Sequence, residues 1–191
     1  MPNISLSSRC NLHCPYCFAH ETMGAGSGDI TLENFDAALE FLTRTGPVNI
    51  GLIGGEPTLH PHFDEIVRRA VACENVAMLT VYTNGLLIEK HAEVLSLPKV
   101  TLLVNRNAPS ELREGAFERI MCGVDELVFN RGMGRRINLG LNLHGETMEY
   151  GYMLDLLKRY GFDKVRISLT VPEFPEGCGQ NAIERFRACK P

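Results

Sequence analysis

The sequence predicts an α/β fold in which parallel strands curl into a partial, TIM-like (β/α)6 barrel. Short runs rich in Val, Ile and Leu alternate along the chain with longer stretches of helical period, which is typical of repeated βα units. The stretches between runs are long enough for the crossover helices that parallel strands require. Several runs also carry polar residues on one face, and a polar barrel interior explains that alternation.

Six strands are expected from these runs. They are Asn3–Ser7, Asn49–Ile53, Ala77–Thr83, Val100–Asn105, Ile137–Leu143 and Val165–Val171. A parallel sheet covered on both faces reads as nearly continuous apolar runs, yet Asn138, Gly140 and Asn142 share one face of the fifth run. The alternative interpretation of this pattern is an antiparallel sheet with one face in solvent.

The helical stretches carry start and stop signals. Thr31 is the expected N-cap of the first helix, and Gly46-Pro47 ends that run. Pro61 is expected in the first turn of the second helix. A later helix is expected around Met153–Tyr160, with its end at Gly161. Residues 124–130 fit a strand, a loop or a helix end.

Length and charge limit the classes of function. The 191 residues suit a single domain spanning 1–191, and whether it lacks a C-terminal extension is open. The chain has 19 Lys and Arg against 23 Asp and Glu, a net charge of −4, with no basic run that would indicate binding to nucleic acid or an anionic membrane. The Met1 end does not show the basic region followed by an apolar region that is typical of a signal peptide, and no apolar stretch approaches the roughly 20 residues of a membrane span. We therefore expect a cytoplasmic protein that binds neither nucleic acid nor membrane.

Three of the seven cysteines lie within eight residues, in Cys10-Asn11-Leu12-His13-Cys14-Pro15-Tyr16-Cys17. Thiolates at this spacing, on a loop after the first strand, are able to converge on one soft metal centre. Structural zinc sites take four ligands, and no second cysteine or histidine pair completes them here. A [4Fe–4S] cluster also ordinarily takes four cysteines, so three leave one iron open to a small molecule.

A second motif, Gly54-Gly55-Glu56-Pro57, follows the second expected strand. In a β/α barrel the loops after the strands form the active face, so Glu56 and the cysteines are expected on the same side. The two glycines are expected to let a ligand approach the backbone, and the Glu56 carboxylate suits an ammonium group. The same four residues are also good turn formers.

Together the two motifs resemble the CxxxCxΦC and GGEP signatures of the radical S-adenosylmethionine (SAM) enzymes. The resemblance implies that Cys10, Cys14 and Cys17 hold a [4Fe–4S] cluster, that SAM chelates its open iron, and that Tyr16 lies near the adenine. It implies that the Gly54-Gly55-Glu56 element holds the amino group of SAM. It also implies reductive cleavage of SAM, by electrons from a reductant such as flavodoxin or ferredoxin, to a 5′-deoxyadenosyl radical that abstracts a substrate hydrogen.

Four further residues, at strand ends or on the expected inner face, lie where the family supplies polar contacts to SAM: Thr83, Asn84, Asn105 and Asn142. Arg166, on the expected inner face of the last strand, is a candidate to contact the substrate or the SAM carboxylate, because a guanidinium group suits carboxylates. Each also has a structural alternative, because Asn84-Gly85 is a common turn pair and a mid-strand arginine often pairs with an acid. The family's glycine-rich element on strand five is poorly matched.

The remaining cysteines and histidines carry weaker signals. Cys73 and Cys122 are expected to be small buried thiols on helices. Whether Cys178 or Cys189 contributes to an auxiliary cluster is open. His13 is expected to be exposed rather than a ligand.

The substrate class is less well defined than the chemistry. Phe18-Ala19 after the third cysteine resembles the subgroup that modifies peptides or protein side chains. Glycyl-radical activating enzymes and small-molecule, deazapurine-type enzymes are the alternatives within the family. A non-catalytic protein that binds zinc or a structural cluster is the alternative outside it.

Overall fold

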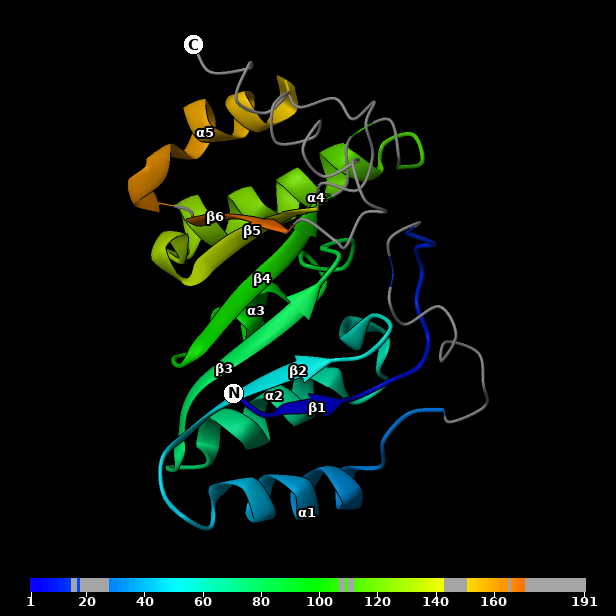
Figure 1. Cartoon of the computed structure of the whole chain (residues 1–191), viewed down its shortest axis with the longest axis vertical. Helices are drawn as coiled ribbons and strands as arrows, with labels where there is room; N and C mark the ends of the chain where they lie inside the picture. Colours follow the sequence, from blue (N-terminus) through cyan, green and yellow to red (C-terminus); the bar gives the residue numbers. More distant parts are fainter. Residues whose placement is uncertain are drawn as a thin grey trace, which may run out of the picture.

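The computed structural model describes residues 1–14, 17, 28–106, 109, 112–142, 151–164 and 166–170 (Figure 1). For residues 106, 141, 142, 153, 162–164 and 166–170 only the backbone is described. The strands form one six-stranded sheet in chain order, and every neighbouring pair is parallel. The strands are β1 Asn3–Ser5, β2 Val48–Ile53, β3 Val76–Thr83, β4 Val100–Arg106, β5 Ile137–Asn142 and β6 Arg166–Thr170.

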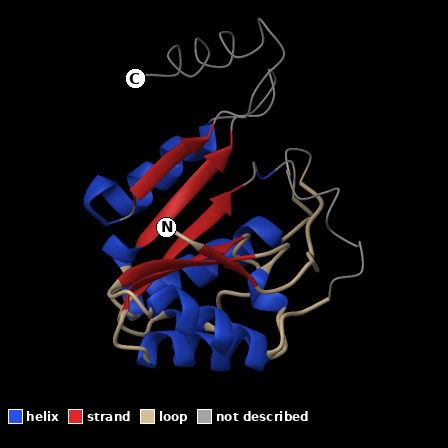
Figure 2. Cartoon of the chain, turned by 60° about the horizontal axis from the view of Figure 1, so that its bottom comes forward, coloured by secondary structure: helices blue, strands red, loops and turns tan. Residues whose placement is uncertain are grey.

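The predicted parallel α/β fold is therefore confirmed, and the antiparallel alternative is wrong. All six expected strands are present, and their bounds differ from the prediction by two residues at most. The sheet is curved (Figure 2), and among the described strands β1 and β6 are its two unpaired edges. The described part is thus an open barrel.

Within the described residues, five helices connect the strands. They are α1 Leu32–Thr43, α2 Phe63–Ala72, α3 Ala92–Leu95, α4 Ala116–Asp125 and α5 Gly151–Lys164. Short helical turns add Pro57–Leu59, Glu126–Asn130 and Gly134–Arg136. No helix in the described ranges is long and apolar enough to span a membrane.

The helix signals in the sequence were mostly informative. Thr31 caps α1, since its side chain accepts a hydrogen bond from the backbone N of Asn34 at 3.1 Å. Gly161 interrupts the last helix with a left-handed φ of 68°. Pro61 lies outside α2, because the helix begins at Phe63 with His62 as N-cap, so that expectation is wrong. Residues 126–130 continue α4 as a wider helical turn.

The alternation along the strands separates an apolar face from a polar one. Leu52, Val81, Leu102 and Ile137 are register neighbours across four strands, and each is at most 1% exposed. The apolar stripes of the helices pack against this outer face (Figure 2), for example Phe35 of α1. The strands thus turn their intervening polar residues toward the concave face.

One cysteine prediction is confirmed in part and another is wrong. Cys73 ends α2 and is half-buried against the core. Cys122 is exposed, because α4 buries Ile120 and Val124 and the residue midway between them faces outward. Cys178 and Cys189 lie outside the described residues.

Candidate active site at the carboxyl ends of the strands

The cysteine loop and the GGEP motif are joined by backbone hydrogen bonds at the carboxyl ends of β1 and β2. The backbone N of Leu6 donates to Ile53 O at 2.8 Å, and that of Gly55 donates to Ser7 O at 2.8 Å. The backbone N of Glu56 then donates to Arg9 O at 2.8 Å. These bonds continue the pairing of β1 with β2 beyond both strands, and they bring Glu56 beside the residue that precedes Cys10.

The two glycines of the motif allow this close approach. A Cβ atom on Gly54 would lie 2.5 Å from Ser7 O. A Cβ on Gly55 would lie 2.4 Å from Arg9 O and 3.1 Å from the Cβ of Cys10. Backbone at these distances cannot accommodate a side chain. The structure therefore accounts for both glycines by the approach of the cysteine loop, whereas the sequence suggested the approach of a ligand.

Glu56 is a buried carboxylate surrounded by donors. It is 1% exposed, and its Oε1 accepts hydrogen bonds from Thr58 N at 3.1 Å, Thr58 Oγ1 at 2.6 Å and Thr83 Oγ1 at 2.7 Å. Its Oε2 accepts one from Asn84 N at 2.7 Å. Burial raises the pKa of Glu56, and the hydrogen bonds from Asn84, Thr58 and Thr83 offset part of that rise. Oε2 accepts from one protein donor among the described contacts, so a lone pair on this oxygen is left to accept a further hydrogen bond.

Thr83 and Asn84 support this carboxylate and the cysteine loop. Thr83 is 2% exposed, and its Oγ1 both donates to Glu56 and accepts from Gly85 N at 3.0 Å. The Nδ2 of Asn84 donates to Asn11 Oδ1 at 2.7 Å, and the Oδ1 of Asn84 accepts from Leu86 N at 3.1 Å. Asn84 thus links the GGEP segment to the residue after Cys10. Direct contact of either side chain with SAM stays a prediction.

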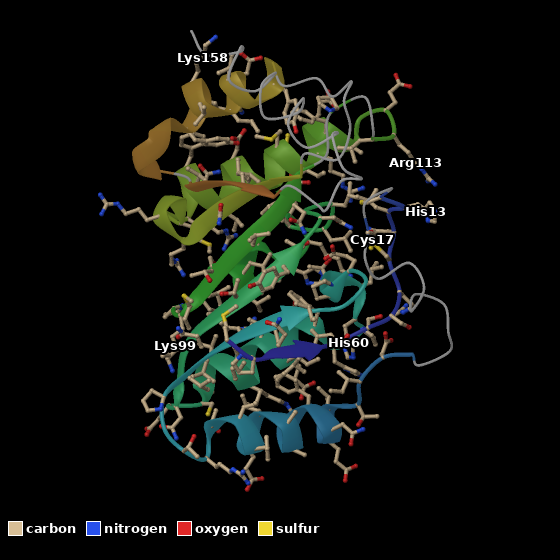
Figure 3. The ribbon with its side chains drawn as sticks, in the orientation of Figure 1. His13, Cys17, His60, Lys99, Arg113 and Lys158 are labelled. Carbon is tan, nitrogen blue, oxygen red and sulfur yellow. The ribbon has the colours of Figure 1, made fainter. Side chains whose placement is uncertain are left out.

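The three cysteines are close in space but do not yet form a set of ligands. All three are partly exposed, and Cys17 N donates to Cys14 O at 3.1 Å. Burial raises the pKa of Cys10, and the nearby charges of Glu56, Cys14 and Cys17 raise it further. Within the described ranges no three His, Cys, Asp or Glu side chains have the spacing of a metal site. Figure 3 shows Cys17 and the exposed His13 together at this edge.

Repulsion among neighbouring thiolates is relieved when a cation binds them, so this set of donors fits an iron–sulfur cluster. Three soft ligands on one loop, beside a carboxylate with room for an additional donor, also suit a cluster whose open iron takes a chelating ligand. Tyr16, expected near the adenine, lies outside the described residues.

The other predicted contacts lie on β4, β5 and β6. Asn105 is the register partner of Gly140, and a Cβ on Gly140 would lie 2.9 Å from Asn105 Oδ1. The Asn105 side chain therefore occupies the face in front of Gly140. Asn142 and Arg166 lie on β5 and β6, where only their backbones are described.

Four residues of the site were missed in the sequence: Ser7, Arg9, Asn11 and Thr58. Thr58 donates two hydrogen bonds to Glu56, and the others contact residues far along the chain: Ser7 contacts Gly55, Arg9 contacts Asp29, and Asn11 contacts Asn84. Adjacency to the two motifs was the only sequence signal available for them.

Curated relatives with similar sequences are nucleotide cyclases by name. The chain is 31% identical over 132 residues to the GTP 3′,8-cyclase of Peptoclostridium acidaminophilum, covering 64% of this chain and 41% of the relative. It is 33% identical over 130 residues to the probable GTP 3′,8-cyclase of Methanocella arvoryzae, with the same two coverages. The chain therefore spans about two fifths of the length of these relatives.

Solved structures with the same fold include SuiB of Streptococcus suis. SuiB bound to S-adenosylmethionine superposes with a TM-score of 0.70 at 18% identity, covering 98% of this chain and 44% of SuiB. SuiB bound to its precursor peptide SuiA gives 0.69 at 20% identity, covering 90% and 39%.

The family model described as the radical SAM superfamily matches residues 4–150, a range that includes both motifs, β1 from its second residue onward, and β2 to β5. Members of this family are enzymes that use a [4Fe–4S] cluster and S-adenosylmethionine. On this match, the chain belongs to the radical SAM superfamily.

Proposed function

We propose that the chain is the catalytic core of an enzyme that cleaves SAM reductively and uses the product to remove a hydrogen atom from a substrate. The cluster, when bound, supplies the electron for that cleavage. Cys10, Cys14 and Cys17 would hold it as thiolates, and Glu56 would accept a hydrogen bond from the SAM amino group through Oε2.

The observation that carries this proposal is the contact between the two motifs. Glu56 N donates to Arg9 O, so the carboxylate segment is fixed beside the start of the cysteine loop. A ligand that must reach an iron and an anionic acceptor at once needs these two groups at a fixed separation. Thr58, Thr83 and Asn84 hold Glu56 in one orientation, which lowers the cost of ordering it when the ammonium group arrives.

The concave face would orient SAM and the substrate. Asn105 lies on this face and has amide groups suited to polar contacts, and Asn142 and Arg166 would add contacts from the neighbouring strands. Gly54 and Gly55 would serve SAM through the backbone that their small size brings close to Cys10. Glu56 is 1% exposed, and its burial strengthens the polar contacts that its carboxylate makes.

Two substrate classes follow from different observations. A purine nucleoside triphosphate is supported by the relatives named GTP 3′,8-cyclase, whose sequence identity to this chain exceeds 30%. A peptide or protein side chain is supported by Phe18-Ala19 and by the likeness to SuiB with its bound precursor peptide. We propose the nucleotide as the first substrate to test, with peptide modification as the second candidate.

The test is SAM cleavage by the anaerobically reconstituted, dithionite-reduced protein, with 5′-deoxyadenosine measured by chromatography. Metal analysis of the same sample is expected to give iron and sulfide near four each per chain. Formation of 5′-deoxyadenosine that rises on addition of GTP would support the nucleotide. A tightly bound zinc ion with no sulfide, or a full cluster with no cleavage under any condition, would contradict the proposal.

A further inference from the structure

The two ends of the cysteine loop, residues 10–28, are held together by backbone contacts. Ser7 and Asp29 form an antiparallel bridge. Ser8 N donates to Gly28 O at 3.3 Å, and Ile30 N donates to Leu6 O at 2.9 Å. We call residues 6–9 and 28–30 the loop neck. Every bond of the neck is made by described residues.

Arg9 and Asp29 add a side-chain clasp to this neck. Arg9 Nε donates to Asp29 Oδ1 at 3.2 Å, and Arg9 Nη2 donates to Asp29 Oδ2 at 2.7 Å. A guanidinium fork on a carboxylate fixes orientation as well as distance. Burial opposes the ionisation of Asp29, but hydrogen bonds from Ser7 and Arg9 outweigh it and lower the pKa of Asp29.

The same guanidinium reaches the segment that follows Glu56. Arg9 Nη2 also donates to Leu59 O at 2.9 Å. Leu59 closes the turn Pro57–Leu59, whose N-cap is Glu56, because Leu59 N donates to Glu56 O at 3.1 Å. Arg9 therefore connects both sides of the loop neck to the short turn that begins at the buried carboxylate.

His60 makes a second, buried attachment between the same two segments. It is 3% exposed, and its Nδ1 accepts from His62 N at 3.1 Å. Its Nε2 is then the protonated nitrogen, and it donates to Ile30 O at 2.8 Å. Figure 3 shows His60 at the same edge of the molecule as Cys17. The segment after Glu56 is thus attached to the loop neck twice, by the bond from Arg9 to Leu59 O and by the bond from His60 to Ile30 O.

We propose that Arg9 and Asp29 are positioning residues for SAM, since their clasp fixes the start of the cysteine loop relative to Glu56. This rests on the proposed function, in which SAM contacts the cluster on the cysteines and the Glu56 carboxylate at the same time. Without the clasp the cysteines still provide three thiolates, but the neck has more freedom that must be lost when SAM bridges the two motifs. The expected defect is therefore in SAM binding and not in cluster assembly.

The first variant is Asp29→Ala in the full chain. Because the pair is partly exposed, the KM for SAM is expected to rise about fivefold, which is the range of a modest ion pair converted to an affinity. The turnover number, the iron and sulfide content, and the EPR spectrum of the reduced cluster without SAM are expected to match the unaltered protein. The SAM concentration that gives half of the SAM-induced change in the EPR spectrum is expected to rise about fivefold. Asp29→Glu keeps the charge and the acceptors, so it is expected to restore most of the affinity.

A matched control is Glu93→Ala. Arg68 pairs with Glu93 at 2.6 Å between α2 and α3, away from the motifs. The two arginines are similarly exposed, Arg68 at 50% and Arg9 at 54%, whereas the Glu93 carboxylate is 76% exposed and that of Asp29 25%. This variant removes the same charge and is expected to leave the KM for SAM unchanged. An unchanged KM in Asp29→Ala, or an equal rise in Glu93→Ala, would overturn the proposal. Loss of the cluster in Asp29→Ala would also overturn it, because Asp29 would then act in assembly.

Hydrogen–deuterium exchange of the ligand-free protein separates this proposal from the proposed function. The amides of Ser8 and Ile30 are expected to exchange faster in Asp29→Ala and at the original rate in Glu93→Ala. If the unaltered protein forms no 5′-deoxyadenosine, the proposed function fails whatever the exchange shows. If the protein cleaves SAM but the neck amides exchange at the same rate in Asp29→Ala, the clasp proposal alone fails.

Discussion

The two ends of the sheet satisfy their polar groups in opposite ways. At the carboxyl end, O–H and N–H donors converge on the buried carboxylate of Glu56. At the amino end, cations cover backbone carbonyls. Lys99 Nζ donates to Val71 O at 3.2 Å and to Cys73 O at 2.9 Å, in the last turn and at the C-cap of α2. Figure 3 shows Lys99 and Cys17 at opposite ends of the strands.

Arg136, directly before β5, donates hydrogen bonds to three further carbonyls at the amino end. Its Nη1 donates to Leu97 O at 2.7 Å and to Val100 O at 3.1 Å, and its Nη2 donates to Ser96 O at 3.2 Å. These contacts complete hydrogen bonding that α3 and β4 leave open. The carboxyl end instead keeps partly exposed thiols and a carboxylate oxygen with room for a donor. The amino end is therefore built for stability and the carboxyl end for binding.

The largest expected effect comes from Cys14→Ala. Removing one of three thiolates is expected to abolish both the cluster and SAM cleavage, because the remaining two cannot hold three irons. The measurements are iron and sulfide content and 5′-deoxyadenosine formation. Cys122→Ala is the matched control, since Cys122 is an exposed free cysteine on α4, and it is expected to change neither. A Cys14→Ala protein with a full cluster and SAM cleavage would show that the ligand assignment is wrong.

Glu56→Gln is expected to keep the cluster and weaken SAM binding. The substitution removes the negative charge opposite the ammonium group, and a charged hydrogen bond of about 1.5–3 kcal/mol corresponds to a loss of about 10- to 150-fold in affinity. Equilibrium SAM binding to the cluster-loaded protein measures it. Thr83→Val removes one donor to Glu56 without removing the charge, so its effect is expected to be smaller, and Thr83→Ser is expected to retain the hydrogen bond. An effect of Thr83→Val larger than that of Glu56→Gln would mean that Thr83 contacts SAM directly.

Acid is expected to change stability and SAM affinity in opposite directions through Glu56. Burial raises the pKa of Glu56 in the folded protein above its value in the unfolded chain. Protonation of Glu56 therefore stabilises the folded state. This contribution is complete at pH values below the unfolded pKa and is lost as the pH rises through the folded pKa. Protonation also removes the acceptor charge for the ammonium group. On acidification through that range, the unaltered protein is expected to gain stability relative to Glu56→Gln while its SAM affinity falls. Urea unfolding and SAM binding at matched pH values measure both, and parallel pH profiles of the two proteins would contradict the assignment.

Arg136→Ala tests the amino end of the sheet. Loss of three hydrogen bonds to partly buried carbonyls is expected to lower the free energy of unfolding by about 2 kcal/mol. The KM for SAM is expected to stay unchanged in the folded protein. The neighbouring Arg135 is exposed, so Arg135→Ala is the control and is expected to be neutral. A raised KM for SAM in Arg136→Ala would show that the two ends of the sheet are coupled.

The sequence predicted the sheet well because each strand carries its own signal. On β5, for example, leucines alternate with Asn138, Gly140 and Asn142, so the two faces of the strand are visible in its own sequence without knowledge of any other strand. Helical spacing could also have predicted the exposure of Cys122, because a residue two positions from both Ile120 and Val124 lies on the opposite face of α4.

The supporting contacts of the site could not be predicted in this way. Arg9 pairs with Asp29 because the bridge between Ser7 and Asp29 brings the two ends of the cysteine loop together. Asn84 donates to Asn11 because β1, β2 and β3 are adjacent in the sheet. Thr83 Oγ1 donates to the buried carboxylate of Glu56, which the loop after β2 places beside the end of β3. Residue type and spacing therefore identified the chemistry, whereas the contacts that position it depend on tertiary structure.

The smallest expected effect lies at Lys99, where two contributions oppose each other. Lys99 has a left-handed φ of 66°, which costs a side-chain-bearing residue roughly 1–2 kcal/mol, while its Nζ bonds stabilise the end of α2. Lys99→Ala loses the bonds and keeps the strain, so the free energy of unfolding is expected to fall by about 1 kcal/mol. Lys99→Gly loses the bonds but relieves the strain, and is expected to be about 0.5–1 kcal/mol more stable than Lys99→Ala. Equal stability of the two variants would mean that the backbone at this turn changes conformation once Nζ is removed. Neither variant is expected to alter the KM for SAM, because Lys99 lies at the amino end of the sheet and Glu56 at the carboxyl end.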